Sequence, residues 1–459
     1  MKENAASPQR SEKFIRMTTA PVERLVLSLA GPSIAIMMVT SLYNMAATYF
    51  VSALGTSQVG AVGIAFPLMT IIQAIGFFFG QGSGNYISRA LGAEDTDGAS
   101  RMAATALGSG FLFMSLVAAI GIIGLEPFVI MLGATETIKP FAMEYIFFIL
   151  LASPWMVAAT VLNQQLRFQG SAAIAMVGML SGTILNIFLT PVFIFVFHLG
   201  VRGAAISTMF CQMISFFMLL LYSTTRKGNI RIRFSHFTPC LSRFIEMGRG
   251  GAPSLVRQGL LSVSTIVINH FARPYGDAAI AAISIASRIT LFANSLALGF
   301  GQGFQPVCGF NYGAKLYSRV KKAFWFCSRT SFSLLFIISL GMAVFAPQII
   351  AFFRDDPEVI RIGIRGLRLH CIGLPFMAAA VVVNMMAQTM GRPLEASITA
   401  FARQGLILIP SLFIFTPFFG LLGIQLAIPF ADLASLAIFI PVLIRILRIL
   451  SVPDRVLDK

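Results

Sequence analysis

The clearest candidate for chemistry is a carboxylate inside an apolar stretch. Asp432 lies in PFADLASLAIF, far from any polar flank, and could hold a proton or a cation. A charge in the middle of a bilayer costs about 2.5 kcal/mol or more and usually has a function. Arg403 and Arg257, which also lie in apolar stretches, are its candidate partners. The pattern predicts either a structural ion pair or a site where protonation of Asp432 breaks the pair.

The other reactive residue types form no catalytic constellation. The five cysteines lack the spacing of a zinc site or a disulfide framework. The four histidines are equally dispersed: His198, His236, His270 and His370. We therefore expect no enzyme activity, no metal and no cofactor.

Two glutamines stand in an unusual repeated setting. Phe-Gly-Gln-Gly occurs at 79–82 and again at 300–303, 221 residues later, and each copy closes an apolar run. Gln81 and Gln302 either line a cavity or hydrogen bond between helices. The same offset pairs further residues: Pro32 with Pro253, Pro154 with Pro375, Asn163 with Asn384, and Gly170 with Gly391. This register predicts an internal duplication.

The composition indicates that lipid, rather than water, surrounds most of this chain. Of 459 residues, 57% are hydrophobic and 11% are charged, against about 25% charged in soluble domains. Mean hydropathy is +0.83. A membrane-spanning helix needs about 20 mostly apolar residues. Twelve such runs occur, six in each repeat: 24–46, 58–85, 99–121, 139–160, 172–198, 200–223, 244–271, 278–305, 322–344, 363–389, 397–418 and 421–448.

The net charge of +16 reports topology rather than a nucleic-acid partner. If the runs alternate in direction, both tails and the most basic loops fall on one side, and basic loops stay in the cytoplasm. Both termini are therefore expected in the cytoplasm. The predicted division is a cytoplasmic tail at 1–20, a six-helix N-lobe at 21–226, a basic linker at 227–243, a six-helix C-lobe at 244–450 and a tail at 451–459.

An even number of spans in each repeat fixes the symmetry. Both lobes enter the membrane from the same side, so the axis that relates them runs along the membrane normal. Parallel repeats of this kind bind substrate between the halves and alternate its access by rocking. The fold class expected is an all-α membrane protein with twelve transmembrane helices in two pseudo-symmetric bundles.

Several long motifs carry a family resemblance. GFGQGFQPVCGFNYGAKLYSRVKKA (299–323), GRPLEASITAFARQGLILIP (391–410) and LNIFLTPVFIFVFHLGVRGAAIST (185–208) resemble the multidrug and toxic compound extrusion (MATE) family, most of all its MepA-like branch. The resemblance spans residues 20 to 450. It implies a V-shaped fold and export of organic cations and amphipathic drugs, driven by inward H⁺ or Na⁺. It also implies a monomer in a bacterial inner membrane.

The resemblance also assigns site residues, with two departures. The family's N-lobe ion site uses two aspartates, and Ala47 and Thr190 replace them here, while Asn186 and Thr208 remain. Since alanine and threonine supply no anionic oxygen, this site is expected to be weakened or abandoned. The ion-coupling residues expected are Asn186, Thr208, Asp432, Arg403 and Arg257. The substrate-cavity residues implied are Tyr43, Asn44, Thr48, Gln81, Asn163, Asn269 and Gln302.

Two alternatives stay open. One is a flippase of a lipid-linked or anionic substrate within the same superfamily, since Arg257 and Arg288 could hold an anion. The other is an uncoupled facilitator, which the missing aspartates would permit.

Overall fold

The structure is a computed structural model made of helices. It describes residues 12–52, 56–225, 230, 232–354 and 356–454; of residues 41–52, 56, 225, 234 and 277 it describes the backbone alone. We call the helices up to residue 225 the N-half and those from residue 241 the C-half. The N-half consists of α1 (Glu12–Thr19), α2 (Val22–Ser52), α3 (Thr56–Gly92), α4 (Thr96–Ile123), α5 (Leu125–Met131), α6 (Lys139–Phe168), α7 (Ala172–Pro191), the π-helical η1 (Val192–Val196) and α8 (Gly200–Thr225).

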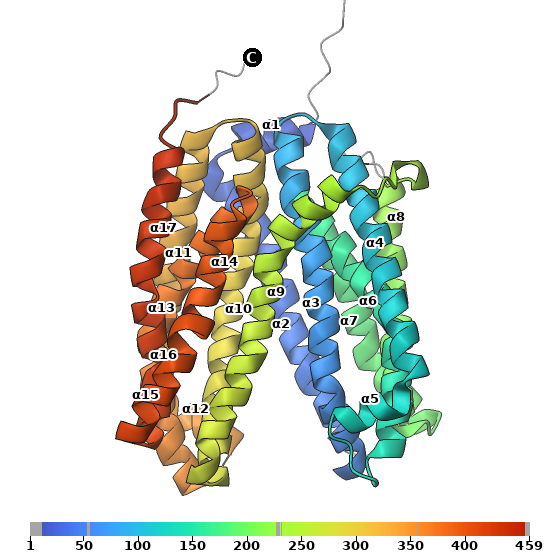
Figure 1. Ribbon diagram of the computed structural model, residues 1–459, viewed down its shortest axis with the longest axis vertical. Coiled ribbons are helices and arrows are strands. Elements are labelled where there is room, and N and C mark those ends of the chain that lie inside the picture. The colour runs from blue at the N-terminus through green and yellow to red at the C-terminus, as the bar shows by residue number, and fades with distance from the viewer. Residues whose placement is uncertain (1–11, 53–55, 226–229, 231, 355, 455–459) are drawn as a thin grey trace, which may run out of the picture.

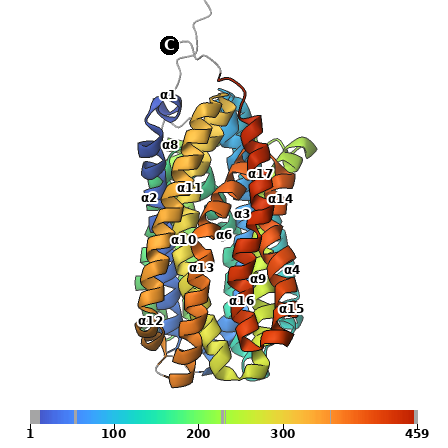
Figure 2. The ribbon, with the colours of Figure 1, turned by 90° about the vertical axis from the view of Figure 1, so that its left-hand side faces the viewer.

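The C-half repeats this order. A short 3-10 turn, η2 (Phe234–His236), precedes it. Its elements are α9 (Leu241–Ala272), η3 (Arg273–Tyr275), α10 (Asp277–Gly313), α11 (Tyr317–Val344), α12 (Ala346–Phe353), α13 (Pro357–Thr389), α14 (Pro393–Phe401), the π-helical η4 (Ala402–Leu408), α15 (Ile409–Phe419), α16 (Leu421–Ala434) and α17 (Leu436–Ile449). The axes of the long helices lie roughly along the long axis of the molecule in both views (Figures 1 and 2).

Eleven helical segments in the described residues are long and apolar enough to cross a membrane. Large apolar side chains such as Phe66, Ile123 and Phe352 stand exposed on the outside, as lipid-facing residues do. The predicted span at 244–271 is not among these segments; α9 carries Arg243, Glu246 and Arg249 near its start and Arg257 further along. Nevertheless, α9 runs the height of the bundle beside the others (Figure 1).

Helix bounds confirm the predicted duplication. Thr56–Gly92 of α3 and Asp277–Gly313 of α10 are 221 residues apart at both ends, as are the bounds of α4 and α11. The turns match as well: φ is 64° at Glu94 and 60° at Lys315, and 79° at Gly170 and 75° at Gly391. The two halves therefore share a fold down to their backbone turns.

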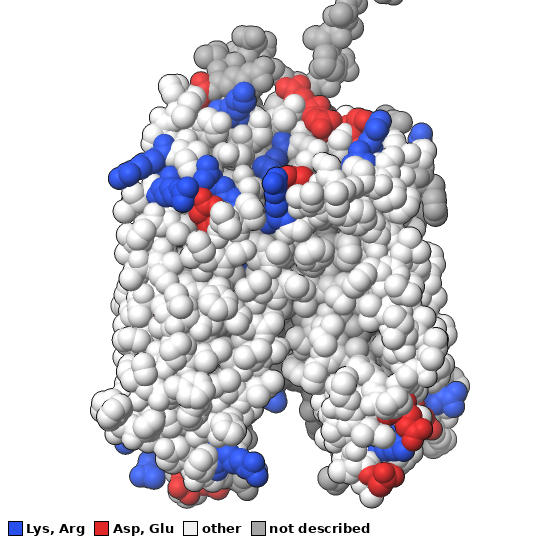
Figure 3. Space-filling view, viewed as in Figure 1, with Lys and Arg blue, Asp and Glu red and all other residues white. Residues whose placement is uncertain are grey.

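The halves touch at one end and part at the other. α2 and α3 of the N-half meet α9 and α10 of the C-half at the upper end in Figure 1. We call this contact the seam, the upper end the closed end and the lower end the open end. Figure 3 shows a cleft between the halves at the open end.

Glycine makes the close approach at the seam possible. A Cβ on Gly303 of α10 would lie 2.5 Å from the backbone nitrogen of Ala30, and one on Gly82 of α3 would overlap the carbonyl oxygen of Met247. Both glycines end an FGQG motif. The doubled motif thus lies where the two backbones cross.

Candidate transport cleft and ion sites

The motif glutamines lie buried in the seam. Gln81 accepts a hydrogen bond from the Ser254 hydroxyl at 3.1 Å, which joins α3 to α9. Gln302 accepts one from the Arg167 guanidinium, which joins α10 to α6. In this conformation neither side chain reaches the open part of the cleft. A role in lining the cavity stays a prediction for a conformation in which the seam is parted.

Asn163 forms a contact inside its own half. Its side-chain amide donates to the Ala175 carbonyl at 2.9 Å and so ties α6 to α7. Asn384 does the same to Ala396 at 2.7 Å in the C-half. The matched pair explains the repeat of this asparagine as a packing requirement. Substrate contact by Asn163 remains a prediction.

Asn269 is the predicted cavity residue that stands exposed. It follows Gly251 by 18 residues, or five helical turns, so both lie on the same face of α9. Gly251 abuts the backbone of Phe78 in α3, so this face is directed at the N-half. Near the open end, that direction leads into the cleft. The side chains of Tyr43, Asn44, Ala47 and Thr48 lie outside the described residues.

The N-half polar cluster assembles around Thr190. Its hydroxyl donates to Asn186 Oδ1 at 2.7 Å and lies 2.8 Å from the Ser207 hydroxyl. The Asn186 amide in turn donates to the Thr208 hydroxyl at 3.4 Å. The residues that the family resemblance selected are thus neighbours on α7 and α8, with Ser207 added. Each of these four side chains is neutral, so the cluster offers a cation no anionic oxygen.

The C-half holds a charged pair instead. Arg403 Nε donates a hydrogen bond to Asp432 Oδ1, so Arg403 is the partner of Asp432 out of the two that were predicted. The Asp432 side chain is only 3% exposed, and that of Arg403 is 23% exposed. Gly373 of α13 leaves room for the carboxylate, because a Cβ there would overlap Asp432 Oδ2. Arg403 lies in η4, and such π-helical turns are frequent at functional sites.

A histidine that the sequence left unassigned lies next to this pair along α13. His370 precedes Gly373 by one turn and is therefore on the same helix face. It is buried, and its Nδ1 lies 3.2 Å from the Thr290 hydroxyl of α10. The sequence does not show that Gly373 contacts Asp432, so it gives no sign that a histidine one turn before Gly373 lies near the ion pair.

Arg257 does not pair with Asp432. It follows Gly250 by seven residues, about two helical turns, and a Cβ on Gly250 would lie 3.0 Å from the carbonyl oxygen of Gly82 in α3. Arg257 therefore lies on the face of α9 that is directed at the N-half, where it is half-buried. No described residue forms a hydrogen bond or ion pair with its guanidinium.

Arg167 is the buried cation that sequence reasoning missed. Its side chain donates to Gln302 and Gln164, while its Nε has no partner among the described residues. Only 2% of the residue is exposed. In the sequence LRFQG it resembles a basic residue that flanks a span, so no sequence signal placed it in the seam.

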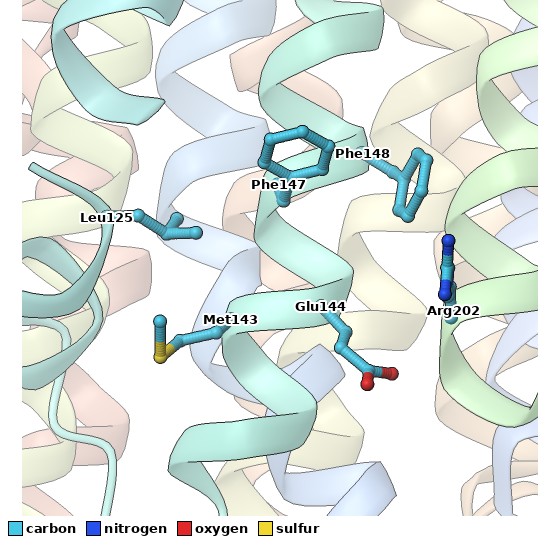
Figure 4. A pocket seen from close by; sticks show the side chains of 6 residues that line it. All are labelled: Leu125, Met143, Glu144, Phe147, Phe148 and Arg202. Atoms are coloured by element: carbon cyan, nitrogen blue, oxygen red, sulfur yellow. The ribbon is translucent and has the colours of Figure 1, made fainter. Parts of the chain in front are cut away.

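A separate hollow lies on the N-half near the open end. Its volume is about 300 Å³, and its walls come from α5, α6 and α8 (Figure 4). Arg202 lies over the Phe148 ring at 5.2 Å, with Glu144 nearby. Because the N-half alone forms it, this hollow is distinct from the cleft between the halves.

Comparisons with known proteins agree with this architecture. The MatE family model matches residues 32–192 and 253–414, once in each half. The chain is 26% identical over 435 residues to the multidrug export protein MepA of Staphylococcus haemolyticus, covering 94% of this chain and 96% of that protein. MepA of Staphylococcus aureus strain MSSA476 is 26% identical over 421 residues, covering 90% of this chain and 92% of that protein.

Solved structures match over nearly the whole chain. One is the outward-facing conformation of a multidrug resistance MATE family transporter, with a TM-score of 0.90, 25% identity, and coverage of 97% of this chain and 100% of that chain. A second, with the same values, is a MOP superfamily transporter from Pyrococcus furiosus, for which reverse polarity of the binding pocket suggests a different function. The family model covers most of both halves, and the chain therefore belongs to the MATE family of multi-pass membrane transporters.

Proposed function

We propose that this protein is a secondary active antiporter that exports amphipathic organic cations and drugs by alternating access, driven by inward H⁺ or Na⁺. The observation that carries the proposal is the full-length similarity to MepA exporters in a chain whose halves enclose a cleft. A cleft between parallel repeats, sealed at one end, is the geometry that rocking of the halves requires.

The closed end is assigned to the cytoplasm of a bacterial inner membrane. Lysines and arginines gather there in Figure 3, and α1 and the end of α17 lie there too (Figure 1). Basic segments are retained on the cytoplasmic side. Both termini are then cytoplasmic, the cleft opens outward, and the predicted N-lobe and C-lobe of a monomer rock about the seam.

Ion coupling is assigned to the C-half. The cluster of Asn186, Thr190 and Thr208 is neutral, whereas Asp432 supplies a buried carboxylate. A proton or Na⁺ on Asp432 weakens its attraction for Arg403, and a pair that changes strength with occupancy can bias a two-state equilibrium. The N-half site is then atypical for the family, because it has no carboxylate to bind the coupling ion.

The test is transport in proteoliposomes. Ethidium movement is followed under a pH gradient alone and then under a Na⁺ gradient alone, with Asp432→Asn as the matched variant. The proposal expects ethidium movement that depends on one gradient and is lost in the variant. Equal movement without any gradient would instead identify an uncoupled facilitator.

One observation favours a second candidate, transport of an anionic or lipid-linked substrate. Arg257 is half-buried on the face of α9 that is directed at the N-half, and it pairs with no described carboxylate. Arg288, the other arginine considered for this role, is exposed on α10. A fluorescent anionic lipid in the same liposomes decides the matter. Movement of that lipid, lost in Arg257→Gln, together with no movement of ethidium would replace the cation exporter by a flippase.

A further inference from the structure

The two FGQG glutamines occupy equivalent positions but make different contacts across the seam. Gln81 of the N-half meets Ser254 of the C-half, and Gln302 of the C-half meets Arg167 of the N-half. The first contact joins two neutral groups. The second has a guanidinium as its donor, and hydrogen bonds from charged donors are about twice as strong as neutral ones.

The difference lies at one pair of equivalent positions. The 221-residue offset matches Arg167 of α6 with Gln388 of α13. Gln388 donates to the Gly250 carbonyl at 2.6 Å and to the Ser254 hydroxyl at 2.8 Å, and both acceptors belong to its own half. Arg167 instead reaches across the seam to the other half. Of these two equivalent positions, one therefore carries a buried cation and the other a neutral amide.

The surroundings of Arg167 make its contact with Gln302 sensitive to charge. Its two acceptors are side-chain amide oxygens, its Nε is without a partner among the described residues, and the Phe168 ring lies 5.6 Å from its guanidinium carbon. None of the described ion pairs includes it. A carboxylate placed against it would gain a buried and well-oriented partner.

We infer that Arg167 and Gln302 form a latch that holds the closed end shut. α6 belongs to the N-half and α10 to the C-half, so rocking that parts the seam breaks this bond. Whatever it contributes therefore stabilises the closed conformation alone. The inference rests on the alternating access of the proposed function, but on no particular substrate or coupling ion.

Unsatisfied polar atoms at the seam oppose this latch. Asn85 accepts a hydrogen bond from Thr389 and Gln388 donates one to Ser254, but another buried amide atom of each has no hydrogen-bond partner among the described residues. An unpaired buried cation and unsatisfied amides destabilise the closed seam, against its close helix packing. Arg167 and Gln302 thus affect the equilibrium between the closed and the parted seam, and in this role they take no direct part in binding substrate or ion.

Isosteric substitutions at the two motif glutamines give the test. Gln302→Glu puts a carboxylate against Arg167 when the seam is closed, whereas Gln81→Glu puts one against the Ser254 hydroxyl, without a cation. Spin labels at Asp97 and Arg448, which are both exposed, report the separation of the halves. Asp97 is in the first turn of α4 and Arg448 in the last turn of α17, and these helix ends lie at the closed end (Figure 1). A Cys240→Ser background suffices, since the other four cysteines are buried.

We expect Gln302→Glu to lower the population with a parted seam by about tenfold or more. Gln81→Glu should not lower it. Gln302→Ala should raise it, which keeps the latch visible if the parent protein is already closed, and Gln81→Ala should raise it less. Adding Arg167→Gln should cancel the effect of Gln302→Glu.

The measurement needs neither substrate nor gradient, so it is separate from the transport assays. Monodisperse elution of each variant confirms folding. The inference is overturned if Gln302→Glu and Gln81→Glu shift the distances in the same direction. It is also overturned if Gln302→Ala leaves them unchanged.

Discussion

Removing the charge of Asp432 tests whether its ion pair is only structural. Asp432→Asn leaves Arg403 without its carboxylate, and breaking a fully buried pair costs about 3–5 kcal/mol of stability. The Asp432 side chain is 3% exposed, but that of Arg403 is 23% exposed and can be partly hydrated. We therefore expect a smaller loss, about 2–3 kcal/mol.

The double variant Asp432→Asn with Arg403→Gln separates the two roles. It removes both charges and keeps groups that can hydrogen bond, so most of the lost stability should return. Thermal unfolding in detergent measures this recovery. Proteoliposome transport under a pH gradient and under a Na⁺ gradient then measures coupling in a protein that folds.

The outcomes divide cleanly. If the pair couples transport to the ion, the double variant is stable but its ethidium flux no longer responds to either gradient. A stable double variant with full gradient-driven flux refutes the coupling role and leaves a structural tie. An unchanged Tm in Asp432→Asn refutes the energetic reasoning itself.

Three further predictions follow from the same geometry. Gly82→Ala should part the seam and cost about 1–3 kcal/mol, because the new Cβ overlaps the Met247 backbone; spin-label distances and Tm check this. Gly373→Ala should push Asp432 away from Arg403 and reduce gradient-driven flux while leaving expression intact, which normal flux would contradict. Ala47→Asp with Thr190→Asp should change the ion dependence of transport, because two carboxylates return to the N-half; an unchanged dependence would show that the N-half site has no part in coupling.

Part of this architecture can be predicted from the sequence because the protein lies in a lipid bilayer. A bilayer requires long apolar runs, so eleven of the twelve predicted spans pass on composition, and the duplication follows from prolines, asparagines and glycines that recur at one offset. The Asp432–Arg403 pair was predictable for the same reason, since charges inside apolar runs are few and must find partners.

The contacts across the seam could not be predicted from the sequence in this way. A glutamine in an apolar run shows that some neighbour is polar, but not which helix supplies it. Gln81 and Gln302 therefore read equally well as cavity lining, and Arg167 as a residue at the end of a span. Which residues meet across the halves depends on helix crossings, and these depend on glycines such as Gly82 and Gly303 whose contacts emerge only in three dimensions.

One helix connects the charged pair to the seam. α13 contacts Asp432 through Gly373, and 15 residues later, about 22 Å along the helix, its Gln388 and Thr389 reach the closed end. There Thr389 donates to Asn85 of the N-half at 2.9 Å, and its carbonyl accepts from Arg89 at 2.8 Å. Pro375, two residues after Gly373, removes a helix hydrogen bond close to the pair and so provides a point of bending. A change in the Asp432–Arg403 contact therefore has a continuous physical route to the residues that hold the two halves together.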